Sequence, residues 1–103
     1  MDCVKLFYKE ELLGVLTYIK PQYIFVKNDK FSDKTMFVHM GLQDKNEYYS
    51  NNLFAFFYKF IPERSRLDIL EKASINLEED SEFDILKKVA KLDLNRRQFW
   101  IGL

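Results

Sequence analysis

The side chains of this sequence that could do chemistry are few and scattered. His39 is the only histidine and Cys3 the only cysteine of the 103 residues. Neither has a second histidine or cysteine at metal-ligand spacing, and no base close to Cys3 in sequence would activate its thiol as a nucleophile. We interpret His39 as an ordinary sheet or surface histidine, and Cys3 as a small apolar strand residue.

The acidic residues and glycines do not form a recognisable ligand site either. Glu78-Glu79-Asp80 lacks the glycine and the regular oxygen spacing of a calcium loop, and it is typical of the acidic start of a helix. Gly14, Gly41 and Gly102 are too far apart for a phosphate-binding loop. The sequence therefore predicts no catalytic, cofactor-binding or metal-ligating residue, and we expect that the protein is not an enzyme.

Two arginine pairs remain as candidates for binding. Arg96-Arg97, beside an aromatic pair, could contact nucleic acid. The equal numbers of basic and acidic side chains, 16 of each, favour a solvated edge instead. Arg64-Ser65-Arg66 supports two interpretations equally: a helix cap with two solvated arginines, or a presented contact loop, because arginine is a favoured interface residue. The candidate partner-binding residues are Pro62, Glu63, Arg64, Ser65 and Arg66.

Length and composition predict a single domain over residues 1–103. Hydrophobic residues make up 48% and aromatic residues 17% of the chain, which suffices for one core. The longest apolar run, Leu53–Tyr58, is far short of the ~20 residues that a membrane helix needs. Asp2 and the charges after it interrupt any secretory signal, and one cysteine allows no internal disulfide. We expect a cytoplasmic protein.

The first half of the chain predicts strands. Cys3–Tyr8, Leu12–Tyr18 and Gln22–Val26 are β-favouring runs separated by short polar turns, as in an antiparallel meander. Thr35–Met40 resembles a fourth strand, and Leu42–Tyr49 has no clean period and is interpreted as a loop.

One strand carries two finer predictions. Alternation in Leu12–Tyr18 places Leu13 and Leu16 on opposite faces. Gly14, inside the same strand, indicates a bulge or close packing.

The second half changes to helical spacing. Leu53, Phe56, Phe57 and Phe60 recur at i, i+3, i+4 and i+7, which predicts an apolar helix capped by Ser50 or Asn51. Phe54 and Tyr58 lie on its neighbouring flank, so the helix should be buried on more than one side. Pro62 should end it.

Two more helices should follow. Ser65 and Asp68 resemble a capping box, with Leu67, Leu70 and Ala73 facing inward. Asp80 or Ser81 should cap a third helix, whose apolar positions are Phe83, Leu86, and Val89 or Ala90. Residues 97–101 could return as a short strand. The fold class predicted is α+β: an N-terminal antiparallel meander packed against about three C-terminal helices, with a short final strand.

Three segments, in order, resemble a known family. Lys5–Leu16, Leu53–Glu63 and Ser81–Leu86 look like the N-terminal subdomain of HipA-type serine/threonine kinases, which has a strand with a G-x-L ending, then FF-x-N-L-L-P-E-G, then D-x-F-x-L-L. The chain stops where that family continues into its kinase core. It therefore resembles HipS, the small subunit of tripartite HipBST toxin–antitoxin systems, which binds and restrains a HipT kinase that lacks this subdomain.

Three positions depart from the pattern of these relatives. The asparagine before L-L-P-E is Lys59 here, and the glycine after Pro-Glu is Arg64. The next position, often tryptophan in HipS relatives and thought to approach the kinase active site, is Ser65. An aromatic plug therefore cannot operate in this chain.

The resemblance implies an antitoxin subunit that binds and inhibits a HipT-like kinase in trans through residues 62–66. The alternative is a structural or regulatory subunit that stabilises a kinase–repressor–DNA complex without inhibiting the kinase. A HipB-like helix-turn-helix repressor would then be a further partner through the complex. No cofactor, direct nucleic-acid contact or membrane is expected.

Overall fold

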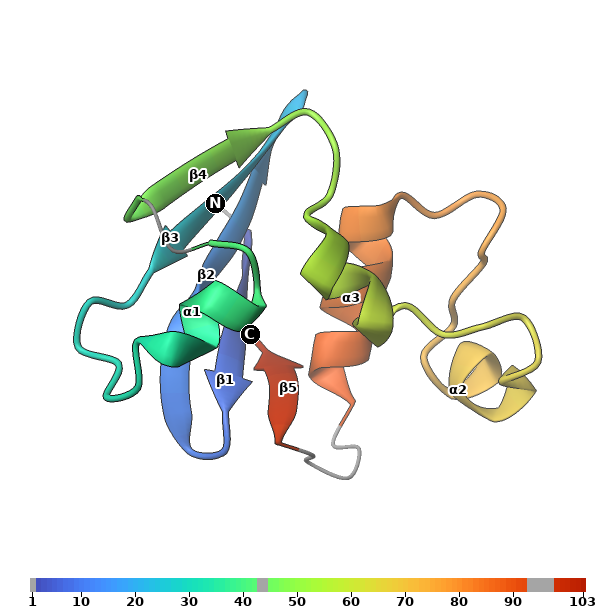
Figure 1. The fold of residues 1–103 in the computed structure, drawn as a ribbon. Helices are drawn as coiled ribbons and strands as arrows, with labels where there is room; N and C mark the ends of the chain where they lie inside the picture. Colours follow the sequence, from blue (N-terminus) through green and yellow to red (C-terminus); the bar gives the residue numbers. More distant parts are fainter. Residues whose placement is uncertain (1, 43–44, 93–97) are drawn as a thin grey trace.

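The computed structural model describes residues 2–42, 45–92 and 98–103. Five strands form an antiparallel sheet in the order β4-β3-β2-β1-β5 (Figure 1). The strands are β1 (Cys3–Tyr8), β2 (Glu11–Ile19), β3 (Gln22–Lys27), β4 (Glu47–Ser50) and β5 (Phe99–Gly102). The helices are α1 (Thr35–His39), the 3₁₀ helix η1 (Ala55–Phe60), α2 (Leu67–Lys72) and α3 (Glu82–Lys91). The α+β class, the meander and the final strand are confirmed.

A β-bulge in the first hairpin changes which side chains face the core. Leu6 pairs with Gly14 and Phe7 pairs with Leu12, so Leu13 is an extra residue on β2. Such an insertion shifts the period-two alternation. Leu13 and Leu16 are therefore both fully buried, and the prediction that they lie on opposite faces is wrong.

Gly14 allows two strands and a ring to pack closely, as its place inside a strand predicts. A Cβ at this position would lie 2.5 Å from the ring of Phe25 and 2.6 Å from the carbonyl oxygen of Val26. No side chain larger than hydrogen fits there without displacing one of them.

The predicted fourth strand is a helix. Thr35 donates hydrogen bonds to the Asp33 carboxylate from its N–H (3.0 Å) and its hydroxyl (2.6 Å), which closes a turn and starts α1. Of the helical residues only Phe37 is buried, while Val38 is 57% exposed. The local turn therefore outweighs the β propensity of this run.

The edge strand β4 overlaps the segment predicted as a loop, Leu42–Tyr49. Its residues pair with β3, Glu47 opposite Val26 and Ser50 opposite Tyr23. Its side chains alternate between exposed and half-buried, as expected for a strand that covers one side of a sheet edge.

The aromatic run forms a 3₁₀ helix rather than the predicted α-helix. Phe54 occupies the N-cap without a side-chain hydrogen bond, so neither Ser50 nor Asn51 caps it. In a 3₁₀ helix residues three apart lie in line, which places Phe54, Phe57 and Phe60 toward the core, with Phe57 fully buried. Tyr58 is 46% exposed, so the predicted burial of that flank is wrong for Tyr58, whereas Phe54 packs against the core. The helix does end before Pro62.

Helix α3 packs on the sheet, whereas α2 stands away from it (Figure 1). Ser81 caps α3 by accepting a hydrogen bond from the Asp84 N–H (3.1 Å), as predicted. Phe83 and Leu86 join the main core. No residue of α2 is buried, and Leu67 is 70% exposed, so the inward orientation predicted for Leu67 is wrong.

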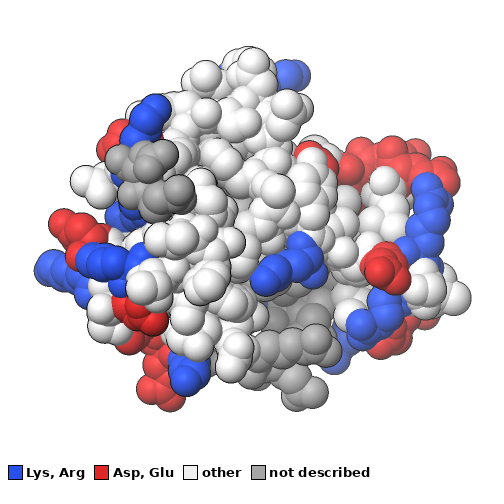
Figure 2. Space-filling model, viewed as in Figure 1, with Lys and Arg blue, Asp and Glu red and all other residues white. Residues whose placement is uncertain are grey.

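α1, η1 and α3 share one face of the sheet. The rings of Phe57 and Phe83 contact Phe25 and Tyr23, which lie two residues apart on β3, and Phe37 contacts Phe31 in the same core. In Figure 2 the middle of the molecule carries few charges, and most Lys, Arg, Asp and Glu side chains gather at the two sides.

Candidate functional site

Residues 62–66 form an exposed elbow between η1 and α2. The Arg66 N–H donates to the Glu63 carbonyl (2.9 Å) and closes a turn. Pro62 is half-buried, while the four residues after it are exposed. Because α2 extends away from the sheet, the elbow lies on a protruding part of the molecule (Figure 1).

Both arginines of the elbow form ion pairs at the surface. Arg64 lies 3.3 Å from a carboxylate oxygen of Glu78, and Arg66 lies 3.4 Å from Asp68. The hydrogen bond from Arg66 holds the pKa of Asp68 below its ordinary value. Exposed pairs of this kind stabilise a fold little, so either guanidinium can exchange its present carboxylate for one on a partner at small cost.

Ser65 lies in the elbow with its side chain exposed and does not cap α2. The N-cap is Arg66, which makes no side-chain cap hydrogen bond, so the predicted capping box with Asp68 is wrong. The helix begins one residue too late for the Ser65 hydroxyl to occupy the cap position. The elbow thus presents two cations, a hydroxyl and the Glu63 carboxylate.

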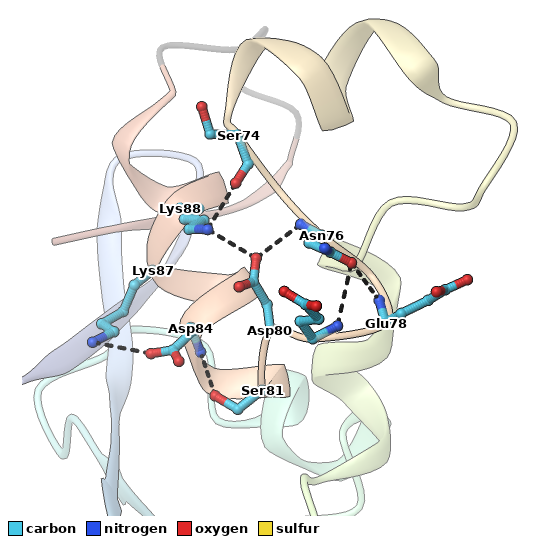
Figure 3. Close-up of polar contacts among 9 residues, drawn as sticks. Ser74, Asn76, Glu78, Asp80, Ser81, Asp84, Lys87 and Lys88 are labelled. Carbon is cyan, nitrogen blue, oxygen red and sulfur yellow. Dashed lines mark hydrogen bonds and ion pairs between the residues drawn. The ribbon is translucent and has the colours of Figure 1, made fainter.

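A polar turn fixes the chain between α2 and α3 (Figure 3). Asp80 accepts hydrogen bonds from the Asn76 N–H (2.9 Å) and from Lys88 Nζ (2.8 Å), and Lys88 also donates to the Ser74 carbonyl (2.7 Å). The hydrogen bond from Lys88, and then that from Asn76, lowers the pKa of Asp80. Glu78, the partner of Arg64, lies in this turn, so the elbow is linked to α3 through it.

An open groove of about 1370 Å³ separates the elbow and α2 from the last strand. Pro62, Glu63 and Arg66 line one side, and every residue of β5 lines the other. Lys59 lies in the groove, with its Nζ 4.1 Å from the ring centre of Phe56 and 4.8 Å from that of Phe99. These two rings hold the ammonium group beside β5.

The comparison with known families bears on this region directly. The family model for the HipA N-terminal domain matches residues 4–93, which include the elbow, α2 and most of the groove. The chain belongs to the HipA N-terminal domain family. A search of the curated proteins found no match.

Membership in the HipA N-terminal domain family indicates a component of a HipA-related toxin–antitoxin system, with protein partners in a complex. The domain of that family is a small subdomain without catalytic function. Of the three departures from the resemblance, Lys59 lines the groove, and Arg64 and Ser65 lie in the exposed elbow.

The other residues considered for chemistry are not brought together. His39 ends α1 with its side chain exposed, rather than lying in a strand, and Cys3 is half-buried in β1. Within the described ranges no three His, Cys, Asp or Glu side chains could hold a metal ion. Arg96 and Arg97 lie outside the described residues.

Sequence reasoning missed the basic lining of the groove. Lys5, Lys59 and Lys91 come from β1, η1 and α3, so only the tertiary fold brings them to the same groove. The one local signal is Lys59 within an otherwise aromatic run. In the part of the chain that is described, no helix is long and apolar enough to cross a membrane.

Proposed function

We propose that the chain is a cytoplasmic antitoxin subunit that binds a HipT-like serine/threonine kinase and inhibits it in trans through the elbow, Pro62 to Arg66. The observation that best supports this function is the exposed elbow. It adjoins α2, which packs little against the core. If Arg64 and Arg66 served mainly to stabilise the fold, their ion pairs would be expected to be buried or held in a fixed geometry. Both ion pairs are instead exposed.

The chemistry of the elbow suits an acidic or phosphate-bearing surface of the kinase. Arginine forms bidentate hydrogen bonds with carboxylates and phosphates. With Ser65 in place of an aromatic side chain, inhibition in this chain would rest on charge and hydrogen bonding instead of on a plug. Activity of the chain itself is not part of the proposal: it acts by binding.

The test is a phosphorylation assay with the HipT-like kinase encoded beside this chain. Saturating wild-type chain should abolish phosphate transfer. The double variant Arg64→Glu/Arg66→Glu should lose most inhibition, because it replaces two cations by anions at the contact. Truncation or reversal of a central interface charge commonly costs about 2 kcal/mol or more of binding.

A matched control has the same change in charge elsewhere. Lys20→Glu/Lys30→Glu alters two exposed lysines in the β2–β3 turn and the loop before α1, away from the elbow. This control should inhibit like the wild type. Full inhibition by the arginine variant would move the contact away from the elbow, and absence of wild-type binding would refute the function. Binding with undiminished phosphate transfer would instead support the non-inhibitory subunit.

A further inference from the structure

The free edge of β5 is the second surface of interest. β5 pairs with β1 alone and ends the strand order of the described sheet. A backbone hydrogen bond from Lys9 to Gln98 (2.6 Å) continues this pairing, and bonded residues alternate along an antiparallel strand. The backbone groups of Phe99 and Ile101 therefore point away from β1. Such an edge can accept a further strand.

The groove leaves room for that strand. The groove, about 1370 Å³ in volume, runs along β5. Val89 and Ala90 of α3 are among its apolar lining residues. On the face of β5 that points away from the core, Trp100 stacks on Phe7 with 4.1 Å between ring centres. These two rings continue the apolar surface. An extended segment would thus find backbone partners on one side and apolar contacts above and below.

The charges that line the groove indicate which kind of segment would bind there. The described charged lining consists of four basic residues and one acidic residue, although the whole chain has equal numbers of each. Arg66 already pairs with Asp68. Lys5, Lys59 and Lys91 remain, and Glu63 is the one acidic residue among the described lining residues. This excess favours a segment that carries carboxylates between its apolar residues.

We propose that an extended acidic segment of a partner protein binds in this groove and adds to the sheet as a strand beside β5. Its backbone pairs with Phe99 and Ile101, its apolar side chains contact Phe7 and Trp100 on one face, and its carboxylates lie near Lys59 and Lys91 on the other. Strand addition draws affinity from backbone hydrogen bonds and specificity from alternate side chains. The proposal concerns the β5 side of the groove, whose opposite side is lined by Pro62, Glu63 and Arg66 of the elbow, and it does not require that the partner be inhibited.

The probe is a short fluorescein-labelled peptide in which glutamates alternate with valines, titrated into the full chain and followed by anisotropy. A matched peptide with lysines in place of the glutamates is the control. The acidic peptide should bind about tenfold more tightly or better. Equal binding of the two peptides, or binding of neither, overturns the proposal.

Backbone methylation tests the strand itself. N-methyl groups on alternate residues, on the edge that faces β5, should abolish binding, while methylation of the intervening residues should leave it intact. Two methylated peptides that both bind would show that no strand is added.

Variants of the chain locate the site. Lys59→Glu/Lys91→Glu should weaken binding of the acidic peptide by about tenfold or more, and Lys20→Glu/Lys30→Glu should not. Since Lys59 contacts two rings, its replacement can reduce stability, so Lys5→Glu/Lys91→Glu serves as a second variant with the same expected effect. No effect of either variant refutes the proposed site. If a second copy of the chain occupies β5 instead, the free protein dimerises with rising concentration and the peptide does not bind.

Discussion

Ser81 and Ser65 each precede an aspartate by three residues, but only the Ser81 hydroxyl accepts a hydrogen bond from the N–H of that aspartate. Ser81 has an extended backbone directly before the first turn of α3. Ser65 lies one residue ahead of the N-cap of α2. The same sequence pattern should therefore contribute differently to the free energy of unfolding at the two positions.

This difference predicts unequal effects of two matched substitutions. Ser81→Ala should lower the free energy of unfolding by about 1 kcal/mol, because it removes a cap. Ser65→Ala should change it by less than about 0.5 kcal/mol, as at most surface positions. Urea unfolding followed by Trp100 fluorescence measures both. Equal losses would mean that Ser65 does cap α2.

At the scale of the elements, Asp80 and Lys88 join the turn after α2 to helix α3. The Asp80 pKa is lowered in the folded chain, mainly by the hydrogen bond from Lys88. As pH falls, the unfolded chain therefore takes up this proton before the folded chain does. The stabilisation is complete above the ordinary value of 3.8 and is lost as pH falls through the lowered pKa.

Asp80→Asn should consequently be less stable than the wild type at pH 7, and its disadvantage should shrink as pH falls below about 4. Unfolding in urea at several pH values gives both curves. Asp68→Asn is the comparison: it removes a carboxylate whose pKa is also lowered, so it should follow the same trend with a smaller loss, because the Arg66–Asp68 pair is exposed. Parallel curves for the wild type and Asp80→Asn would contradict the role given to Asp80.

The elements that sequence could predict are those with a regular local period. The meander, the end of the aromatic helix at Pro62, α3 with its cap and the final strand all follow from alternation, proline and capping chemistry. α1 was missed because the Asp33 side chain starts a turn within a β-favouring run. β4 was missed because pairing with β3, a tertiary contact, makes it a strand.

Part of the candidate site could likewise be predicted from local sequence, and part could not. Pro62 and the charges after it identify the elbow from sequence alone. The bulge at Leu13, which arises from the register of two strands, and the groove beside β5, which unites three distant segments, cannot be derived from spacing. The phase of the core face on β2 depends on that bulge, so alternation alone misplaced Leu13 and Leu16.

At the scale of the whole molecule, packing is unevenly distributed. The sheet and α3 contain most of the main core, including the fully buried Leu16 and Leu86, whereas α2 contributes no buried residue. α2 is joined to the remainder through the half-buried Leu70, the buried Ile75 and the polar turn around Asp80. A segment with so few apolar contacts can open without unfolding of the sheet.

Native-state hydrogen exchange should therefore separate the two parts. The α2 amides, such as Leu70 and Ala73, which donate to Arg66 and Ile69, should exchange about a hundredfold faster or more than those of β2, which lies between two strands. Asp80→Asn should accelerate exchange in α2 and leave β2 nearly unchanged at low denaturant, because it weakens only the attachment of that segment. Equal protection of α2 and β2 would show that α2 unfolds together with the sheet.

Fast local opening of α2 would also mean that a partner bound at the elbow slows exchange of the α2 amides. This slowing gives the proposed contact a readout that is independent of kinase activity.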